Sequence, residues 1–397
     1  MSALLALLVS LLILSFSANA GEWEYGEGFD DELIFLHEFV NYEIDPDWRR
    51  EWDRTLFSAS GMRYSYGSVS KHTLFERSDV LINRDLGDGW GFRTHVRRYG
   101  ATHRSDDEFS AFLGFRKSIA PALSLCLESD LSPDKDTVDG SFGVLVADKG
   151  DANYARLLFV WDDLTWDARN GEGGDSDRLP LGLSWLARYE RGPWELFLSG
   201  KYTLGYDRNY PDVSRSPDLL GHERQMNEAD MRLSRLFKNG VRCEAEVSLY
   251  HFDDSRGYRD YSLDYSYLNT VSHGALRCLI PRGGNRIRLE AHGVRQFRRS
   301  DGSHDFRYDR REIMPAAFVS RAAGKHTVEI GYLSSVFDWE YDGYDGTPDH
   351  YRNDYIDKMK IGWTYEFNKR ARIQFSLSHV VSISNFGGGN GQYVMVF

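Results

Sequence analysis

The sequence predicts an all-β fold, namely a transmembrane antiparallel up-and-down β-barrel of eighteen strands, with sixteen strands as the alternative. Two patterns in the 397 residues predict it. Apolar and polar residues alternate with a period of two, and the connections between the alternating segments are short and long in turn. A third observation excludes a bundle of membrane helices, because no stretch of about eighteen apolar residues follows residue 20.

The amino-acid composition excludes further classes of protein. The chain is 41% hydrophobic and 14% aromatic, which excludes simple disorder. Its mean hydropathy of −0.50 fits a barrel whose strands each carry one polar face. The net charge of −12 argues against a nucleic-acid partner, because phosphates need a basic surface.

The N-terminus carries an export signal. An apolar run covers residues 4–14, and Ala18-Asn19-Ala20 before Gly21 has the small-x-small form of a signal-peptidase site. We expect residues 1–20 to be a cleavable signal peptide. The alternative is an uncleaved anchor, for which the run is short.

Residues 21–55 form an acidic, aromatic segment of different character. Leu33, Leu36, Phe39 and Val40 recur at helical spacing within residues 30–41. We expect a short periplasmic helix or a plug, followed by the barrel over residues 56–397.

Period-two alternation marks the strands of this barrel. Ala371, Ile373, Phe375 and Leu377 share one face, and arginine, glutamine and serine share the other. The same division occurs in residues 194–204, 286–292 and 358–367. Segments of ten to thirteen residues suit a tilted strand that crosses a bilayer.

The connections set the strand count. Short turns are expected near residues 87–89, 119–121, 148–150, 191–193, 238–240, 281–284, 323–325 and 368–369. Longer loops are expected at residues 100–107, 131–137, 167–178, 206–221, 253–260, 299–308, 340–354 and 384–391. Short periplasmic turns and long extracellular loops are typical of transmembrane β-barrels. Because the strand at 73–86 enters a short turn, a strand at 56–67 must precede it. This parity gives eighteen strands. If one pair of these segments is not a pair of strands, sixteen remain.

The cysteines are odd in number and far apart. Cys126, Cys243 and Cys278 each fall in a strand-like segment. We therefore expect small strand side chains and neither a disulfide framework nor a zinc site. No metal site is predicted elsewhere.

The chain ends with large residues at alternate positions, Tyr393, Met395 and Phe397. This pattern resembles the C-terminal assembly signal of Gram-negative outer-membrane β-barrels, and with the export signal and both alternations the resemblance covers residues 56–397. It implies a location in the bacterial outer membrane and insertion by the barrel-assembly machinery. Its further partners would be outer-membrane lipid and lipopolysaccharide. No narrower family and no oligomeric state are indicated.

Basic residues gather on the polar strand faces, which should line the lumen. The candidate lumen-lining residues are Arg93, His95, Arg97, Arg156, Arg242, Arg286, Arg288, Arg370 and Arg372. Guanidinium groups bind carboxylates and phosphates, so such a lumen would favour anionic solutes. In the alternative interpretation, Glu195, Glu244, Glu246, Glu290 and Glu366 pair with the arginines and brace the wall.

A barrel of eighteen strands leaves an aqueous lumen unless it is plugged. We therefore expect a channel or export pore for small hydrophilic solutes, with anionic saccharides as a candidate class, and we expect neither a cofactor nor catalysis. One alternative is a barrel-borne hydrolase, for which His379, Ser382, Ser384 and Asn385 lie close in sequence but without a recognisable spacing. The other is a non-conducting adhesion or scaffold barrel.

Overall fold

The computed structural model describes residues 62–70, 74–101, 108–130, 137–148, 153–166, 175–176, 181–204, 206–209, 219–258, 265–302, 306–342, 348–368, 371–383 and 389–396. The predicted signal peptide, the segment at residues 21–55, Arg370 and Phe397 lie outside these ranges. Among the described residues, no helix is long and apolar enough to cross a membrane.

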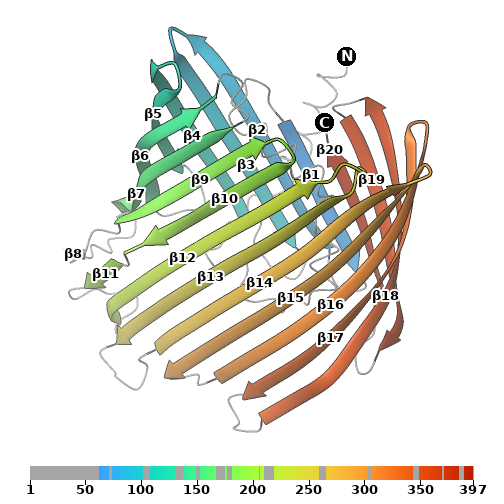
Figure 1. Cartoon of the computed structure of the whole chain (residues 1–397). Coiled ribbons are helices and arrows are strands. Elements are labelled where there is room, and N and C mark those ends of the chain that lie inside the picture. The colour runs from blue at the N-terminus through green and yellow to red at the C-terminus, as the bar shows by residue number, and fades with distance from the viewer. Residues whose placement is uncertain are drawn as a thin grey trace.

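The described strands form one antiparallel sheet that closes on itself (Figure 1). Their bounds are β1 Met62–Ser70, β2 Leu74–Gly87, β3 Trp90–Ala101, β4 Glu108–Ala120, β5 Leu123–Asp130, β6 Thr137–Ala147, β7 Tyr154–Trp166, β8 Asp175–Ser176, β9 Leu181–Arg191, β10 Trp194–Thr203, β11 Tyr206–Asn209, β12 Leu219–Leu236, β13 Arg242–Tyr258, β14 Tyr265–Arg282, β15 Asn285–Gly302, β16 Phe306–Ala323, β17 His326–Asp342, β18 Pro348–Asn368, β19 Ala371–Ile383 and β20 Gly389–Val396.

Eighteen of these twenty strands make the wall of the barrel. Strands β8 and β11 have two and four residues and pair with each other, and β11 also pairs with β12 beside the ring. The other eighteen pair in chain order, and β1 pairs with β20 to close the circuit. The predicted up-and-down barrel of eighteen strands is confirmed over the described residues.

Tight turns join the strands at one end of the barrel. The β14–β15 connection is the pair Gly283 and Gly284, which have φ angles of 57° and 81°. Positive φ at both central residues matches the right-handed twist of the flanking strands, and glycine adopts it without steric cost. The positive φ angles of these two glycines therefore explain why the predicted turn at residues 281–284 is short.

Side chains alternate between the two faces as predicted. In β19, Phe375 and Leu377 are 45% and 62% exposed on the outside, whereas Ser376 between them is buried. In β18, Met359 and Ile361 are exposed while Lys358 and Lys360 are buried. An apolar, exposed outer face and a polar inner face form the arrangement that suits a lipid environment.

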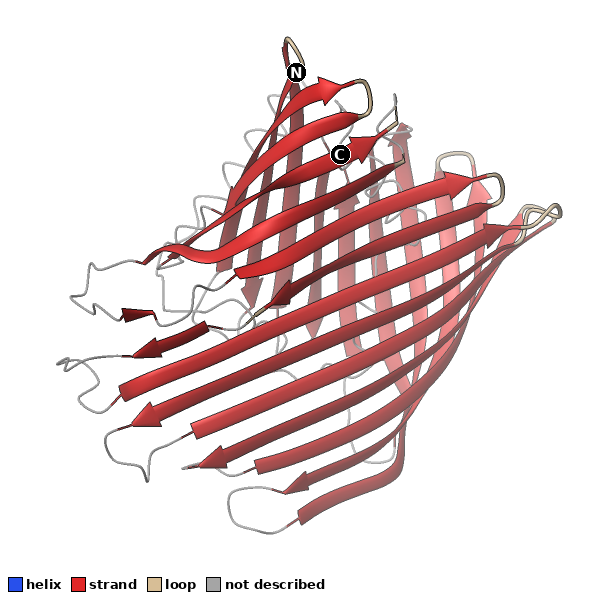
Figure 2. Ribbon diagram, turned by 60° about the vertical axis from the view of Figure 1, so that its left-hand side comes forward, coloured by secondary structure: helices blue, strands red, loops and turns tan. Residues whose placement is uncertain are grey.

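Several strands are longer than predicted. Strands β12 to β18 have 17 to 21 residues and include much of the expected loops at residues 253–260, 299–308 and 340–354 (Figure 2). The ladder continues there although outward residues become charged, as the exposed Arg299 of β15 does while its backbone stays paired with β16. The alternation of apolar residues stops where a strand leaves the apolar band, whereas backbone hydrogen bonding between strands continues beyond it. The first strand is described from Met62 onward, and residues 56–61 of the predicted strand lie outside the described residues.

Apolar side chains also occur on the inner face. One cluster joins Leu81 of β2 to Leu145, Leu158 and Leu186 of β6, β7 and β9. A second joins Met314 and Phe318 of β16 to residues of β15 and β17. The inner wall therefore combines apolar patches with the charged residues described below.

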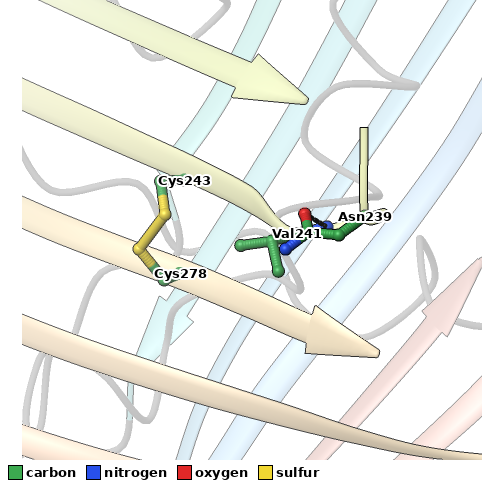
Figure 3. Close-up of a disulfide and its surroundings, with 4 residues drawn as sticks. All are labelled: Asn239, Val241, Cys243 and Cys278. Carbon is green, nitrogen blue, oxygen red and sulfur yellow. Dashed lines mark hydrogen bonds between the residues drawn. A yellow bond between two sulfur atoms is a disulfide. The ribbon is translucent and has the colours of Figure 1, made fainter. Parts of the chain in front are cut away.

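The prediction of unpaired cysteines is wrong for two of the three. Cys243 of β13 and Cys278 of β14 lie opposite each other with Cα atoms 4.1 Å apart and form a disulfide (Figure 3). Nearby, the Val241 N–H donates to Asn239 Oδ1 in the turn that leads into β13. The register of β14 brings together residues that are 35 positions apart, which spacing in sequence does not reveal. Cys126 is free and buried.

Candidate functional site

Charged side chains line the inner face of strands β9 to β17. We call them the charged belt, and its members are Arg188, Glu195, Arg232, Glu244, Glu246, Arg277, Arg288, Glu290 and Glu329. Each belongs to the inward set of its strand, and antiparallel pairing places them side by side around the wall.

Arg277 is the centre of the belt. Its Nη1 atom lies 3.2 Å from Glu244 Oε1 and 2.5 Å from Glu246 Oε2, so one guanidinium serves two carboxylates. Arg232 approaches the same Glu244 from the other side at 4.0 Å. All four side chains are nearly inaccessible, which makes their pairing much less screened than at a surface.

Arg288 extends the belt toward β17. Its guanidinium nitrogens lie 3.3 Å from Glu290 and 3.1 Å from Glu329. The same group lies 4.1 Å from the centre of the Phe318 ring, in a cation–π contact. Arg288 is therefore fixed by two carboxylates and one aromatic face.

Arg188 starts the belt on β9. It donates to Glu195 Oε1 from Nε at 3.1 Å and from Nη2 at 2.9 Å, and it also reaches Glu190 at 2.5 Å. Two hydrogen bonds that converge on one carboxylate oxygen, with a third to Glu190, hold the guanidinium in place.

Two histidines lie beside the belt. The rings of His273 and His292 are stacked with centroids 5.7 Å apart, and His292 Nε2 is 3.1 Å from Glu290 Oε2. His292 and Glu290 are buried and belong to the same strand. This contact adds a further polar partner to Glu290.

A second inner cluster lies on β3, β5 and β7. Arg156 Nη1 donates to both oxygens of Glu128, at 2.7 and 2.6 Å. Arg93 approaches Glu128 at 3.8 Å, an ion pair without a hydrogen bond. Two of the predicted lumen arginines thus meet one carboxylate.

The remaining candidate residues are distributed as follows. His95 stacks on Phe112, Arg242 is half-buried on the inner face of β13, and Arg286 is exposed close to the β14–β15 turn. Arg97 and Arg372 occupy inward register positions of β3 and β19, and only their backbones are described. Likewise, Tyr393 and Met395 stand opposite Phe375 and Ile373 in the register of β20.

Sequence reasoning missed part of the belt. The overlooked residues are Arg188, Arg232, Arg277 and Glu329 of the belt, together with Glu128 of the second cluster. Strand parity would have found most of them, because each follows the inward alternation of its strand. Their pairing depends on register across strands, which the sequence does not display.

The predicted pairing of lumen glutamates with the candidate arginines is observed for Glu290, which meets Arg288. Glu195 pairs with Arg188, and Glu244 and Glu246 pair with Arg277, two arginines that were not among the candidates. Glu366 is exposed, and its register partner is Arg372. In the described part of the chain, no group of three or more His, Cys, Asp or Glu residues could hold a metal ion.

Comparison with known proteins gives only a general likeness. No family model and no curated protein match the chain. Among solved structures, it is similar to the outer-membrane protein OmpT of Vibrio cholerae, with 13% identity over 86% of this chain and 98% of that chain and a TM-score of 0.37. It is also similar to OpdK of Pseudomonas aeruginosa, with 10% identity over 86% and 99% and a TM-score of 0.41. The third is Wzi of Escherichia coli, a carbohydrate-binding barrel, with 9% identity over 88% and 87% and a TM-score of 0.40. The closed barrel with its apolar outer face agrees with the class of fold that the C-terminal pattern resembles.

Proposed function

We propose that this protein is a passive channel of the bacterial outer membrane for small hydrophilic solutes, with anionic saccharides as the favoured class. One observation carries the proposal. Eighteen strands form a closed ring whose outer face is apolar and whose inner face carries the charged belt. A ring of this size encloses water unless a plug fills it, and charged walls favour polar solutes.

The chemistry of the inner wall supports weak selectivity. Among the buried charged side chains of the described residues, six are arginine or lysine and five are glutamate. Most arginines therefore neutralise a neighbouring carboxylate, and only a small cationic excess acts on a passing solute. The proposal includes neither a cofactor nor a chemical step.

Planar-bilayer recording with site-directed cysteines tests the channel. Gln374 and Phe375 are neighbours on opposite faces of β19, one inward and the other 45% exposed outward. We expect steady current from the purified protein. A bulky, charged methanethiosulfonate reagent should reduce the current of Gln374→Cys and leave that of Phe375→Cys unchanged.

The parent protein is the control, because its one free thiol, Cys126, is buried. Absence of current in all three proteins would favour a scaffold barrel, and lipid or peptide cleavage without current would favour the hydrolase. Equal block of both cysteine variants would contradict the assignment of inner and outer faces.

A further inference from the structure

The inner face of β2 to β6 contains a small polar niche, away from the charged belt. Its cavity has a volume of ≈ 190 Å³. The lining residues that matter below are Asn83, Asp85, Arg93, Arg116 and Glu128, with Cys126 and Leu145 also in the lining. We call this cavity the arginine niche.

Two glycines make room for the niche. A Cβ atom on Gly91 would lie 2.8 Å from Arg116 Nε, so the Arg116 side chain lies across the Gly91 backbone. A Cβ atom on Gly114 would lie 3.3 Å from Glu128 Cγ. Glycine at these positions therefore lets two charged side chains lie close to the wall and leaves the space in front of them open.

The charges of the niche favour an anion. Arg93 and Arg116, at inward positions of β3 and β4, belong to its lining together with Asp85 and Glu128. Both oxygens of Glu128 already accept hydrogen bonds from Arg156, outside the niche lining. With Glu128 bonded to Arg156, the cations Arg93 and Arg116 outnumber the one remaining carboxylate of the lining, Asp85, and the buried Cys126 and Leu145 add an apolar part to it.

We propose that the arginine niche binds the carboxylate group of a monomeric acidic sugar, with Arg93 and Arg116 as its cationic contacts and Asn83 as a polar contact for hydroxyl groups. This inference deepens the proposed function and rests on it. Guanidinium groups match carboxylates in a planar, bidentate geometry. A volume below the roughly 300–1,000 Å³ of pockets for drug-sized ligands limits the ligand to about one ring.

The test measures binding and transport separately in the full-length protein. Calorimetric titration in detergent gives the affinity for D-glucuronate, D-glucose and inorganic phosphate, and bilayer recording gives the current block by the same compounds. We expect glucuronate to bind and to interrupt the current, and glucose to do neither. Phosphate binding as tight as that of glucuronate would overturn the assignment to a sugar acid.

Two variants and a matched control locate the site. Arg116→Gln should weaken glucuronate binding by about tenfold or more, because one charge-assisted contact is lost. Gly91→Ala should also weaken it without changing any charge, since the new methyl group displaces the Arg116 side chain. Arg282→Gln, at the exposed end of β14, should bind as the parent does.

The outcomes separate this inference from the channel itself. Current without glucuronate binding, or unchanged affinity in both niche variants, would overturn the niche and leave the channel standing. Glucuronate binding that both niche variants weaken, without any current, would support the niche and overturn the channel.

Discussion

At the residue scale, the belt shows how arginines can be fixed in the wall of a barrel. Arg277 is only 2% exposed and lies between Glu244 and Glu246. Removing one member of such a group leaves the others as buried, uncompensated charges. The pairing is therefore costly to break even where its net contribution to stability is small.

This argument gives a prediction for Arg277→Met. We expect it to lower the free energy of unfolding by about 3–5 kcal/mol, because two buried carboxylates lose their common partner. Urea unfolding in detergent, followed by the gel-mobility change on heating, measures the loss. Arg282→Met at the exposed turn is the control and should cost less than about 0.5 kcal/mol. A belt variant as stable as this control would show that water already solvates the two glutamates.

At the residue scale, the sequence predicted which residues face inward but not which ion-pair partners they have. Alternation placed Arg93 and Arg288 in the lumen, yet their contacts with Glu128 and Glu329 depend on register. Arg277 was missed because it lies in β14, whose bounds the apolar pattern marks poorly.

At the element scale, each strand divides into a lipid-facing and a lumen-facing set. Arg in place of Leu198, Leu289 or Ile361 should cost about 2–4 kcal/mol where the residue lies near the bilayer midplane. Gln374→Arg, on the inner face of β19, should cost much less. Equilibrium folding into lipid vesicles compares the variants, and equal costs on both faces would contradict the assigned register.

The disulfide between β13 and β14 gives a second prediction at this scale. After unfolding without a reductant, the chain should bind one maleimide, at Cys126, because Cys243 and Cys278 are bonded. After reduction it should bind three. Mass spectrometry counts the labels, and three labels without reductant would mean that the two strands are joined by hydrogen bonds alone.

Strand number was predictable and strand length was not. The parity of short and long connections requires an even count and places one strand before β2, as β1 confirms. The long strands β12 to β18 continue beyond the apolar band, where an outward charged residue such as Arg299 gives no strand signal. Backbone hydrogen bonds maintain the ladder at these positions whatever the side chains are.

At the scale of the whole molecule, ion selectivity depends on charges near the lumen and little on the net charge of −12. Salt screens exposed charges within about 8–10 Å, so charges on distant loops act weakly on an ion in the pore. Charges on a wall of low dielectric constant act more strongly. The slight cationic excess among the buried side chains therefore predicts a mild preference for anions.

Reversal potentials in a salt gradient measure this preference. Converting Arg93, Arg97, Arg286 and Arg288 to Gln should move the reversal potential toward cation preference, because each change removes one positive charge from the inward set. Arg286→Gln is the sharper variant, since Arg286 is exposed near a turn and its loss should not disturb folding, whereas Arg288 also holds Glu290 and Glu329. Cation preference in the parent protein would mean that the glutamates dominate the lumen. An unchanged potential in all variants would mean that these arginines only brace the wall, so that the field felt by a passing ion comes from other residues.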